Sequence, residues 1–284
     1  MSGRNASTAD HRQAQARDGT RIAYTVYQQE DSERRAVLVH SLGMDRHFWR
    51  PVVDRLVEAA AVLVYDCRGH GESDKPSEGY TIESFAEDLG AVLADVGWRS
   101  AAVAGASMGG CVALRFAATN PERTTGLGLI DTTAWYGPSA RDNWEQRATQ
   151  ALRSGLKGMI EFQVTRWFSD SFRARHPEVV NRCVETFLRN DAQAFAATCR
   201  MLGAFDGRDL LPRVQAPTAI VVGEEDYATP PAMAEALHRS IAGSTLTVIP
   251  AVRHLTPLEQ PDVVARELLR LLARPTTPQP PAGS

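Results

Sequence analysis

The segment Gly105-Ala106-Ser107-Met108-Gly109-Gly110 decides the fold of this chain. It follows an apolar run at residues 101–104 and leads into a helical pattern at residues 109–119. A Gly-x-Ser-x-Gly turn between a strand and a helix needs its glycines because the serine backbone is strained and its neighbours leave no room for side chains. The serine oxygen then lies near the helix N-terminus, where backbone N–H groups stabilise negative charge. This context favours Ser107 as a catalytic nucleophile over a simple connecting turn.

Short apolar runs alternate with helical patterns on both sides of this turn. The runs that predict strands are residues 36–39, 62–65, 101–104, 128–130, 219–222 and 246–249. The patterns that predict helices are residues 85–96, 109–119 and 261–272. Strands and helices in alternation are typical of a mostly parallel sheet covered by helices on both faces. We therefore expect an α/β core formed by residues 19–134 and 210–274.

Residues 135–209 interrupt this alternation. The segment is helical in pattern, is rich in aromatic and arginine residues, and contains no convincing strand. We therefore expect a helical cap inserted into the core. Outside the core, residues 1–18 are polar and residues 275–284 are proline-rich, so we expect both to be flexible tails.

A nucleophilic serine requires a histidine base that a carboxylate holds in one tautomer. Asp226 and His254 each follow one of the later predicted strands. The chain order Ser107, Asp226, His254 is the one expected for such a fold, so we predict these three as the catalytic residues. The competing acids also lie after predicted strands; they are Asp131, which is the strongest alternative, Glu224 and Glu225.

The loop His40-Ser41-Leu42-Gly43-Met44 follows the predicted strand at residues 36–39. A loop at this place supplies the second backbone N–H of an oxyanion hole in such folds. We predict that the N–H groups of Leu42 and Met108 hold the oxyanion. His40 is expected to brace the loop by hydrogen bonds rather than to act as the base.

The segment Asp66-Cys67-Arg68-Gly69-His70-Gly71-Glu72-Ser73 follows the predicted strand at residues 62–65. Its glycine spacing is typical of a tight turn network. We interpret its role as structural, with Asp66 and Arg68 as candidates for an ion pair and Ser73 as a candidate cap.

Composition narrows the range of partners. Hydrophobic residues make up 43% and charged residues 23% of the 284 residues, and the formal net charge is -3, so we expect neither nucleic acid nor a membrane as a partner. A polar N-terminus without an apolar leader favours a cytoplasmic protein. The cysteines lack Cys-x-x-Cys spacing, so we expect reduced thiols and no metal site; they are Cys67, Cys111, Cys183 and Cys199.

Taken together, the motifs make the chain similar to the α/β-hydrolase superfamily, and within it the chain resembles bacterial 3-oxoadipate enol-lactonases. The resemblance covers residues 19–272. The motifs that carry it are His40-Ser41-Leu42-Gly43, Asp66-x-Arg68-Gly69-His70-Gly71-x-Ser73, Gly105-x-Ser107-Met108-Gly109-Gly110, Asp226-x-Ala228-Thr229-Pro230-Pro231 and His254-Leu255-x-x-x-Glu259-Gln260-Pro261.

The resemblance implies an α/β-hydrolase fold with an inserted helical cap, and a carboxylic ester hydrolase that cleaves a small lactone or ester through an acyl-enzyme. It implies no metal and no organic cofactor. A carboxylesterase or a C–C bond hydrolase of the same fold is the alternative within enzymes. A ligand receptor without catalytic activity is the alternative outside them.

One departure from the lactonase pattern concerns the substrate. Those lactonases commonly read Asn-Thr-Ala-Ala-Arg-Ile-Gly where this chain reads Asp131-Thr132-Thr133-Ala134-Trp135-Tyr136-Gly137. Replacing that arginine with Trp135 removes a charge-assisted partner for a substrate carboxylate. Candidate replacements are the arginines of the predicted cap, Arg141, Arg147, Arg166 and Arg173. We expect an apolar substrate pocket between cap and core, lined by Trp135, Trp144 and Trp167.

Overall fold

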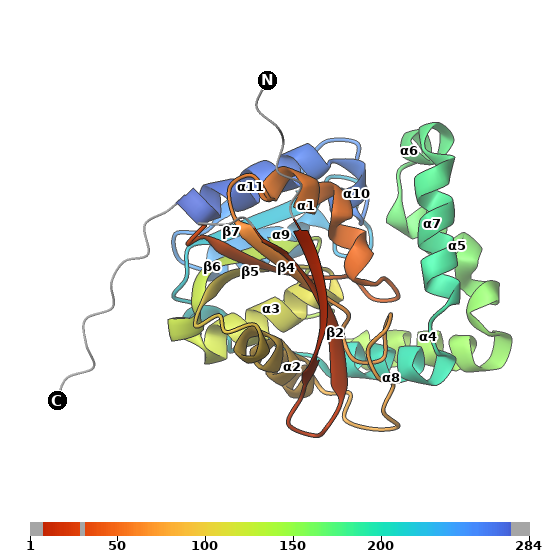
Figure 1. The fold of residues 1–284 in the computed structure, drawn as a ribbon. Helices are drawn as coiled ribbons and strands as arrows, with labels where there is room; N and C mark the ends of the chain where they lie inside the picture. Colours follow the sequence, from red (N-terminus) through yellow and green to blue (C-terminus); the bar gives the residue numbers. More distant parts are fainter. Residues whose placement is uncertain (1–7, 29–31, 274–284) are drawn as a thin grey trace.

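The computed structural model describes residues 8–28 and 32–273. Its strands form one sheet in the order β1-β2-β4-β3-β5-β6-β7-β8 (Figure 1). The strands are β1 (Thr8–Gln15), β2 (Arg21–Gln28), β3 (Arg35–Val39), β4 (Ala61–Tyr65), β5 (Ala101–Ala106), β6 (Thr124–Ile130), β7 (Thr218–Gly223) and β8 (Thr245–Ile249). Neighbouring strands from β4 across to β8 are parallel, which confirms the expected mostly parallel sheet.

Helices cover both faces of this sheet. Helices α1 (Arg50–Leu56) and α11 (Pro261–Ala273) pack against each other on one face, and α2 (Ile82–Asp95) and α3 (Met108–Thr119) do so on the other. Strands such as β4 and β5 are buried along their whole length, because helices leave neither face open to water. The remaining core elements are α9 (Pro231–Ser240), α10 (Thr256–Glu259) and the 3-10 turns Arg46–Trp49, Pro121–Arg123 and Leu211–Arg213. The expected α/β fold is confirmed.

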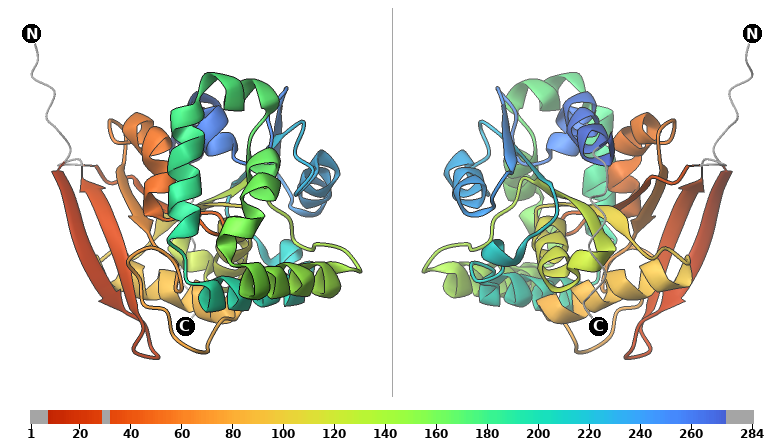
Figure 2. Two further views of the ribbon diagram at one scale, coloured as in Figure 1. Left: turned by 90° about the vertical axis from the view of Figure 1, so that its right-hand side faces the viewer. Right: turned by 90° about the vertical axis from the view of Figure 1, so that its left-hand side faces the viewer.

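The flexible tail expected at residues 1–18 is wrong from Thr8 onward. Residues Thr8–Gln15 form β1, which pairs antiparallel with β2 at one edge of the sheet (Figure 2). Most β1 side chains between Ala9 and Gln15 are exposed or half-buried, and only Ala14 is buried, so this edge strand lacks the apolar run by which the other strands were predicted. Residues 1–7 and the predicted tail at 275–284 lie outside the described residues.

Between β6 and β7 the chain is helical. The helices are α4 (Ala140–Ser154), α5 (Ile160–Trp167), α6 (Asp170–Arg175), α7 (Pro177–Leu188) and α8 (Ala192–Ala204), with a 3-10 turn at Leu156–Met159. They lie together at one side of the core, green to teal in Figure 1. Helix α4 packs on α8 through a face that includes Ala140, Trp144, Ala148 and Ala151, spaced at one helical turn.

No helix among residues 8–28 and 32–273 has the length and apolar character needed to cross a bilayer. The four cysteines are all buried free thiols.

Candidate active site

Ser107 occupies the turn between β5 and α3. Its backbone has φ 53° and ψ -115°, a strained conformation for a residue other than glycine. The flanking glycines are required by close approach, because a Cβ at Gly105 would collide with the Gly109 backbone and a Cβ at Gly109 would collide with the Val39 carbonyl. The turn therefore holds the Ser107 side chain at the carboxyl end of β5, as the sequence predicts.

His254 and Asp226 meet Ser107 at this edge of the sheet. The distance from Ser107 Oγ to His254 Nε2 is 2.9 Å, and the distance from His254 Nδ1 to Asp226 Oδ2 is 2.8 Å. The second Asp226 oxygen accepts backbone N–H groups from Ala228 at 2.7 Å and Thr229 at 3.0 Å. The three predicted catalytic residues are thus brought into one hydrogen-bonded series.

The environment of Asp226 keeps it ionised. Burial alone would raise its pKa, but the facing His254 and the hydrogen bonds from Thr229 hold the pKa below its ordinary value. The Thr229 hydroxyl donates to the same oxygen that faces the imidazole, at 2.8 Å. An ionised Asp226 accepts the Nδ1–H of His254, which leaves Nε2 free to accept the Ser107 proton.

Asp131, the strongest alternative acid, has a different set of partners. Its carboxylate accepts the Gly223 N–H at 3.3 Å, and the N–H and hydroxyl of Thr256 at 2.9 and 2.7 Å. Burial and the charge of Asp226 raise its pKa well above the ordinary value. Asp131 therefore joins the ends of the segments that carry Asp226 and His254, while Asp226 contacts the imidazole. Glu224 and Glu225 are exposed.

The predicted oxyanion donors are the backbone N–H groups of Leu42 and Met108. Helix α3 begins at Met108, so this N–H has no helical carbonyl one turn earlier to which it can donate. Leu42 lies in the loop that follows β3. A hydrogen bond from the Met44 N–H to the Ser41 carbonyl, at 3.0 Å, closes the turn that contains Leu42. Leu42 and Ser107 line the same pocket.

His40 braces this loop. Its Nε2 accepts the Cys67 N–H at 2.9 Å, which fixes the tautomer, so its Nδ1–H donates to the Ser41 carbonyl at 2.8 Å. Burial lowers the pKa of His40 to about 4, so the ring is neutral near pH 7. Its contacts lie within the loop network, as the sequence predicts, and not on Ser107.

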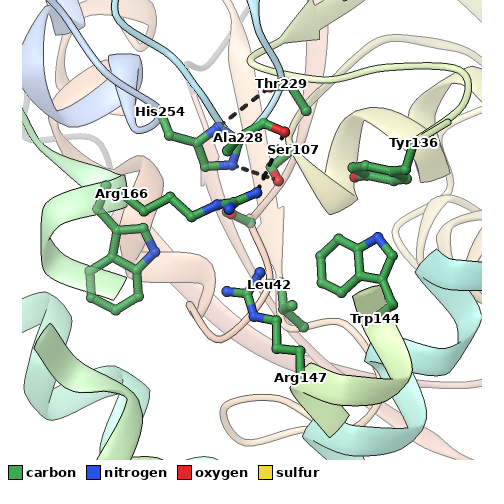
Figure 3. A pocket seen from close by; sticks show the side chains of 11 residues that line it. Leu42, Ser107, Tyr136, Trp144, Arg147, Arg166, Ala228, Thr229 and His254 are labelled. Carbon is green, nitrogen blue, oxygen red and sulfur yellow. Dashed lines mark hydrogen bonds between the residues drawn. The ribbon is translucent and has the colours of Figure 1, made fainter. Parts of the chain in front are cut away.

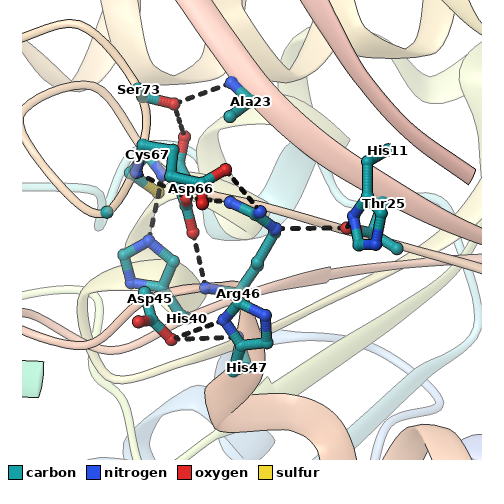
Figure 4. A network of polar contacts seen from close by, with 12 residues as sticks. His11, Ala23, Thr25, His40, Asp45, Arg46, His47, Asp66, Cys67 and Ser73 are labelled. Carbon is teal, nitrogen blue, oxygen red and sulfur yellow. Dashed lines mark hydrogen bonds and ion pairs between the residues drawn. The ribbon is translucent and has the colours of Figure 1, made fainter.

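A buried ion pair extends this network, and it differs from the one that the sequence suggested. Asp66 pairs with the Arg46 guanidinium (Figure 4) and also accepts the Glu72 N–H. Arg68 pairs instead with Asp88 at 2.7 Å. The candidate pair Asp66–Arg68 is therefore wrong. Ser73 does tie the segment down, because its hydroxyl donates to the Asp66 carbonyl at 2.6 Å.

A pocket opens directly onto Ser107 and His254 (Figure 3). Trp144 from α4 and Trp167 from α5 line it, in agreement with the sequence analysis. Tyr136 lines it as well, although its residue type and position did not indicate a role in the site.

Trp135 does not line this pocket, so its assignment as a substrate-binding residue is wrong. Its backbone forms a bridge with Asp206, and its ring stacks on Arg208, whose guanidinium carbon lies 4.0 Å from the ring centroid. In extended backbone, successive side chains point to opposite sides. Tyr136 therefore faces the pocket while Trp135 faces away, and only the backbone direction could have distinguished them.

Two arginines enter the pocket from different helices (Figure 3). Arg147 from α4 donates to the Gln163 side-chain oxygen and lies over Trp144, and its buried Nε has no partner among the described residues. Arg166 from α5 donates to the Ala228 carbonyl at 3.5 Å. Neither guanidinium forms an ion pair with a carboxylate in the part of the chain that the structure describes.

Burial makes the charged form of both arginines less favourable. It lowers the pKa of Arg147 to about 10 and also lowers the pKa of Arg166, where the charge of Asp226 opposes the effect. Of the other two candidates, Arg141 is exposed and Arg173 pairs with Asp170 at 2.5 Å. Desolvated guanidinium groups without an anion are costly to bury.

A wider outer pocket adjoins the first and shares Tyr136, Trp144, Arg147 and Arg166 with it. Phe162 and Tyr227 lie at this outer pocket with exposed fractions of 48% and 50%, on either side of Arg166.

Among residues 8–28 and 32–273, no cluster of three or more His, Cys, Asp or Glu side chains has the arrangement of a metal site.

The fold and this site define an α/β hydrolase, and the comparison with known families agrees. Residues 36–267 match the model of the Alpha/beta hydrolase family, and the chain belongs to this family. Among curated relatives, 3-oxoadipate enol-lactonase 1 of Acinetobacter baylyi is 32% identical over 228 residues, which are 80% of this chain and 84% of the relative. 3-oxoadipate enol-lactonase 2 of the same organism is 30% identical, over 84% of this chain and 88% of its own.

Solved structures of an enol-lactonase and an esterase are also similar to this chain. The enol-lactonase from Burkholderia xenovorans LB400 is 28% identical with a TM-score of 0.88, covering 93% of this chain and 100% of that one. A malate-bound thermophilic esterase from Thermogutta terrifontis is 31% identical with a TM-score of 0.85, also covering 93% and 100%. The resemblance to enol-lactonases expected from the sequence is confirmed.

Proposed function

We propose that this chain is a serine hydrolase that opens a lactone, or cleaves an ester, through an acyl-enzyme on Ser107. The observation that carries the proposal is the hydrogen-bonded series from Ser107 Oγ through His254 to Asp226. This arrangement of nucleophile, base and orienting carboxylate is the one that acyl transfer requires. Because the chain is a hydrolase acting on ester bonds, these residues are the groups available for that chemistry.

The first half of the reaction acylates the enzyme. Ser107 Oγ attacks the substrate carbonyl while His254 Nε2 takes its proton, and the N–H groups of Leu42 and Met108 hold the resulting oxyanion. As the carbonyl re-forms, the bond to the leaving oxygen breaks and His254 returns the proton to that oxygen. For an enol-lactone the leaving group is an enolate, which departs easily, so positioning and oxyanion stabilisation limit the rate.

The second half releases the acid. His254 Nε2 takes a proton from a water molecule, whose oxygen attacks the acyl carbonyl and forms a second oxyanion in the same place. The bond from Ser107 Oγ to the acyl carbon then breaks, and Oγ recovers the proton from His254. No step requires a metal or an organic cofactor.

The substrate that we propose carries a free carboxylate. Arg147 and Arg166 line the pocket beside Ser107, where they can make charge-assisted hydrogen bonds with that carboxylate. Similarity to the esterase solved with malate bound supports an acidic substrate, because malate is a dicarboxylate. We propose that residues 135–209 act as the cap that holds these arginines over Ser107, and that the enzyme is cytoplasmic.

A carboxylesterase that acts on longer esters is the second candidate. The outer pocket favours it, because Phe162 and Tyr227 can contact a substrate that extends beyond the arginines.

A substrate panel with a matched inactive variant tests the proposal. Wild type and Ser107→Ala are assayed on a carboxylated lactone, its uncarboxylated analogue, an aryl ester and a vinylogous diketone. We expect wild type to prefer the carboxylated lactone and Ser107→Ala to lose at least about 10⁴-fold in turnover. Rapid cleavage of the diketone alone would identify a C–C bond hydrolase instead, and a folded wild type that turns over nothing would favour a receptor.

A further inference from the structure

The end of α5 is fastened to the loop that carries His254. The Leu255 N–H donates to the Trp167 carbonyl at 3.0 Å. The Arg253 guanidinium donates to the Thr165 carbonyl at 2.8 Å and to the Phe168 carbonyl at 3.1 Å. The residues on either side of His254 therefore satisfy carbonyl groups at the C-terminus of the helix that carries Arg166 and Trp167.

Glu259 lies at the centre of this attachment. It is only 8% exposed and belongs to the His254-Leu255-x-x-x-Glu259 motif. Its Oε1 accepts the Ser169 N–H at 3.1 Å and the Arg253 N–H at 3.0 Å, and its Oε2 accepts the Ser169 hydroxyl at 2.6 Å. One carboxylate thus joins the residue before His254 to the corner between α5 and α6.

We infer that Glu259 is a positioning residue that fixes Arg166 and Trp167 relative to His254 and thereby sets the selectivity for carboxylated substrates. The inference rests on the proposed function of the same site. Glu259 touches neither Ser107 nor the pocket among the described residues, so it acts only through the residues that it holds.

Glu259 holds the Ser169 side of this corner, beside the contacts that Leu255 and Arg253 make with the end of α5. The main helix contacts of α5 are with α7 and the turn Leu156–Met159, which belong to the same 135–209 segment. Without the Glu259 carboxylate, the Ser169 N–H and the Arg253 N–H would be buried donors without acceptors. The corner would move so that these two N–H groups find other acceptors. The Arg166 guanidinium would move with it, and a displacement of about 1 Å weakens the binding of a carboxylate strongly.

The test compares two esters that differ only in a carboxylate, an aryl propionate and the corresponding aryl hemisuccinate. The ratio of their kcat/KM values does not depend on how much of the enzyme is folded, so it separates positioning from stability. The variants are Glu259→Ala and the conservative Glu259→Gln, which keeps one acceptor oxygen. Glu267→Ala is the matched control, because Glu267 is a buried glutamate of α11 that pairs with Arg270 away from the pocket.

We expect Glu259→Ala to lower the hemisuccinate-to-propionate ratio about tenfold, mainly by raising KM for the hemisuccinate. Glu259→Gln should stay within about threefold of wild type, and Glu267→Ala should leave the ratio unchanged. Hydrogen exchange gives a second readout that needs no activity: amides of residues 166–170 should exchange faster in Glu259→Ala, while those of α4 and α8 should not.

An unchanged ratio in Glu259→Ala would overturn the inference even if the melting temperature falls, and so would unchanged exchange at residues 166–170. Failure of the proposed function looks different, because wild type itself would then cleave neither ester or would not prefer the hemisuccinate. In that case faster exchange at residues 166–170 still supports the attachment by Glu259, and unchanged exchange refutes it.

Discussion

Ser107 Oγ lies 2.9 Å from His254 Nε2, although 147 residues separate the two in the chain. The contact exists because Ser107 follows β5 and His254 follows β8, and these strands run parallel in one sheet. The carboxyl ends of parallel strands share one edge, where loops can bring together side chains that are distant in sequence.

The two buried acids should have separable effects. Asp226→Asn removes the acceptor that orients His254, and we expect kcat to fall on the order of 10⁴-fold. Asp131→Asn leaves that contact intact but weakens the hold on Thr256, so we expect a loss of about 1–3 kcal/mol in the free energy of unfolding and a much smaller loss of kcat. Steady-state kinetics and urea unfolding of both variants check this. A larger loss of kcat in Asp131→Asn than in Asp226→Asn would reverse the assignment.

Removing a pocket arginine should act on the substrate carboxylate alone. Arg166→Met preserves bulk but not charge, and we expect KM for a carboxylated ester to rise roughly tenfold or more, since charge-assisted hydrogen bonds contribute about 1.5–3 kcal/mol. KM for the matched neutral ester should change little. Equal changes for both esters would show that Arg166 packs against substrate without recognising its charge.

Trp135→Arg should not alter this preference. Its ring packs on Arg208 outside the pocket, so a guanidinium at position 135 would not reach the substrate. Kinetics on the same pair of esters measures the outcome. A marked gain in preference for the carboxylated ester would show that residue 135 faces the pocket after all.

Acid should destabilise the protein through two buried histidines. Burial lowers the pKa of His40 to about 4, and burial together with His40 lowers the pKa of His70 to about 3, from an ordinary value of 6.5. Below pH 6.5 the unfolded chain therefore binds more protons than the folded chain, so the free energy of unfolding falls as pH falls, until each folded pKa is reached. Between pH 7.5 and 4.5 each histidine should contribute a loss of about 2–3 kcal/mol.

Denaturant unfolding at several pH values measures this loss, and His70→Gln is the matched variant. The variant should lose less stability than wild type over the same range, because one of the two protonation sites is gone. The same slope in both proteins would mean that other groups cause the acid sensitivity.

The sequence predicted those site residues that have a reactive side chain and directly follow a strand of the parallel sheet. Ser107, Asp226 and His254 were each identified because a reactive residue type follows a clear apolar strand, and parallel topology then brings strand ends together. The polar strand β1 was missed because an edge strand facing water has no apolar run.

Features that depend on the path of the backbone were not predictable. Asp66 pairs with Arg46, 20 positions away, rather than with the nearby Arg68, because Arg68 is drawn to Asp88 on α2. Trp135 and Tyr136 exchange the roles expected from their residue types, because the bridge to Asp206 fixes which side chain faces inward. Glu259 stands in a recognised motif, but its partner Ser169 lies 90 residues away.

The central claim is that Ser107 carries the acyl group, and intact-protein mass spectrometry of the enzyme treated with a fluorophosphonate tests it most directly. We expect one adduct on wild type, assigned by peptide mapping to Ser107, and none on Ser107→Ala under the same conditions. A folded wild type that forms no adduct, or an adduct that maps elsewhere and persists in Ser107→Ala, would contradict the account.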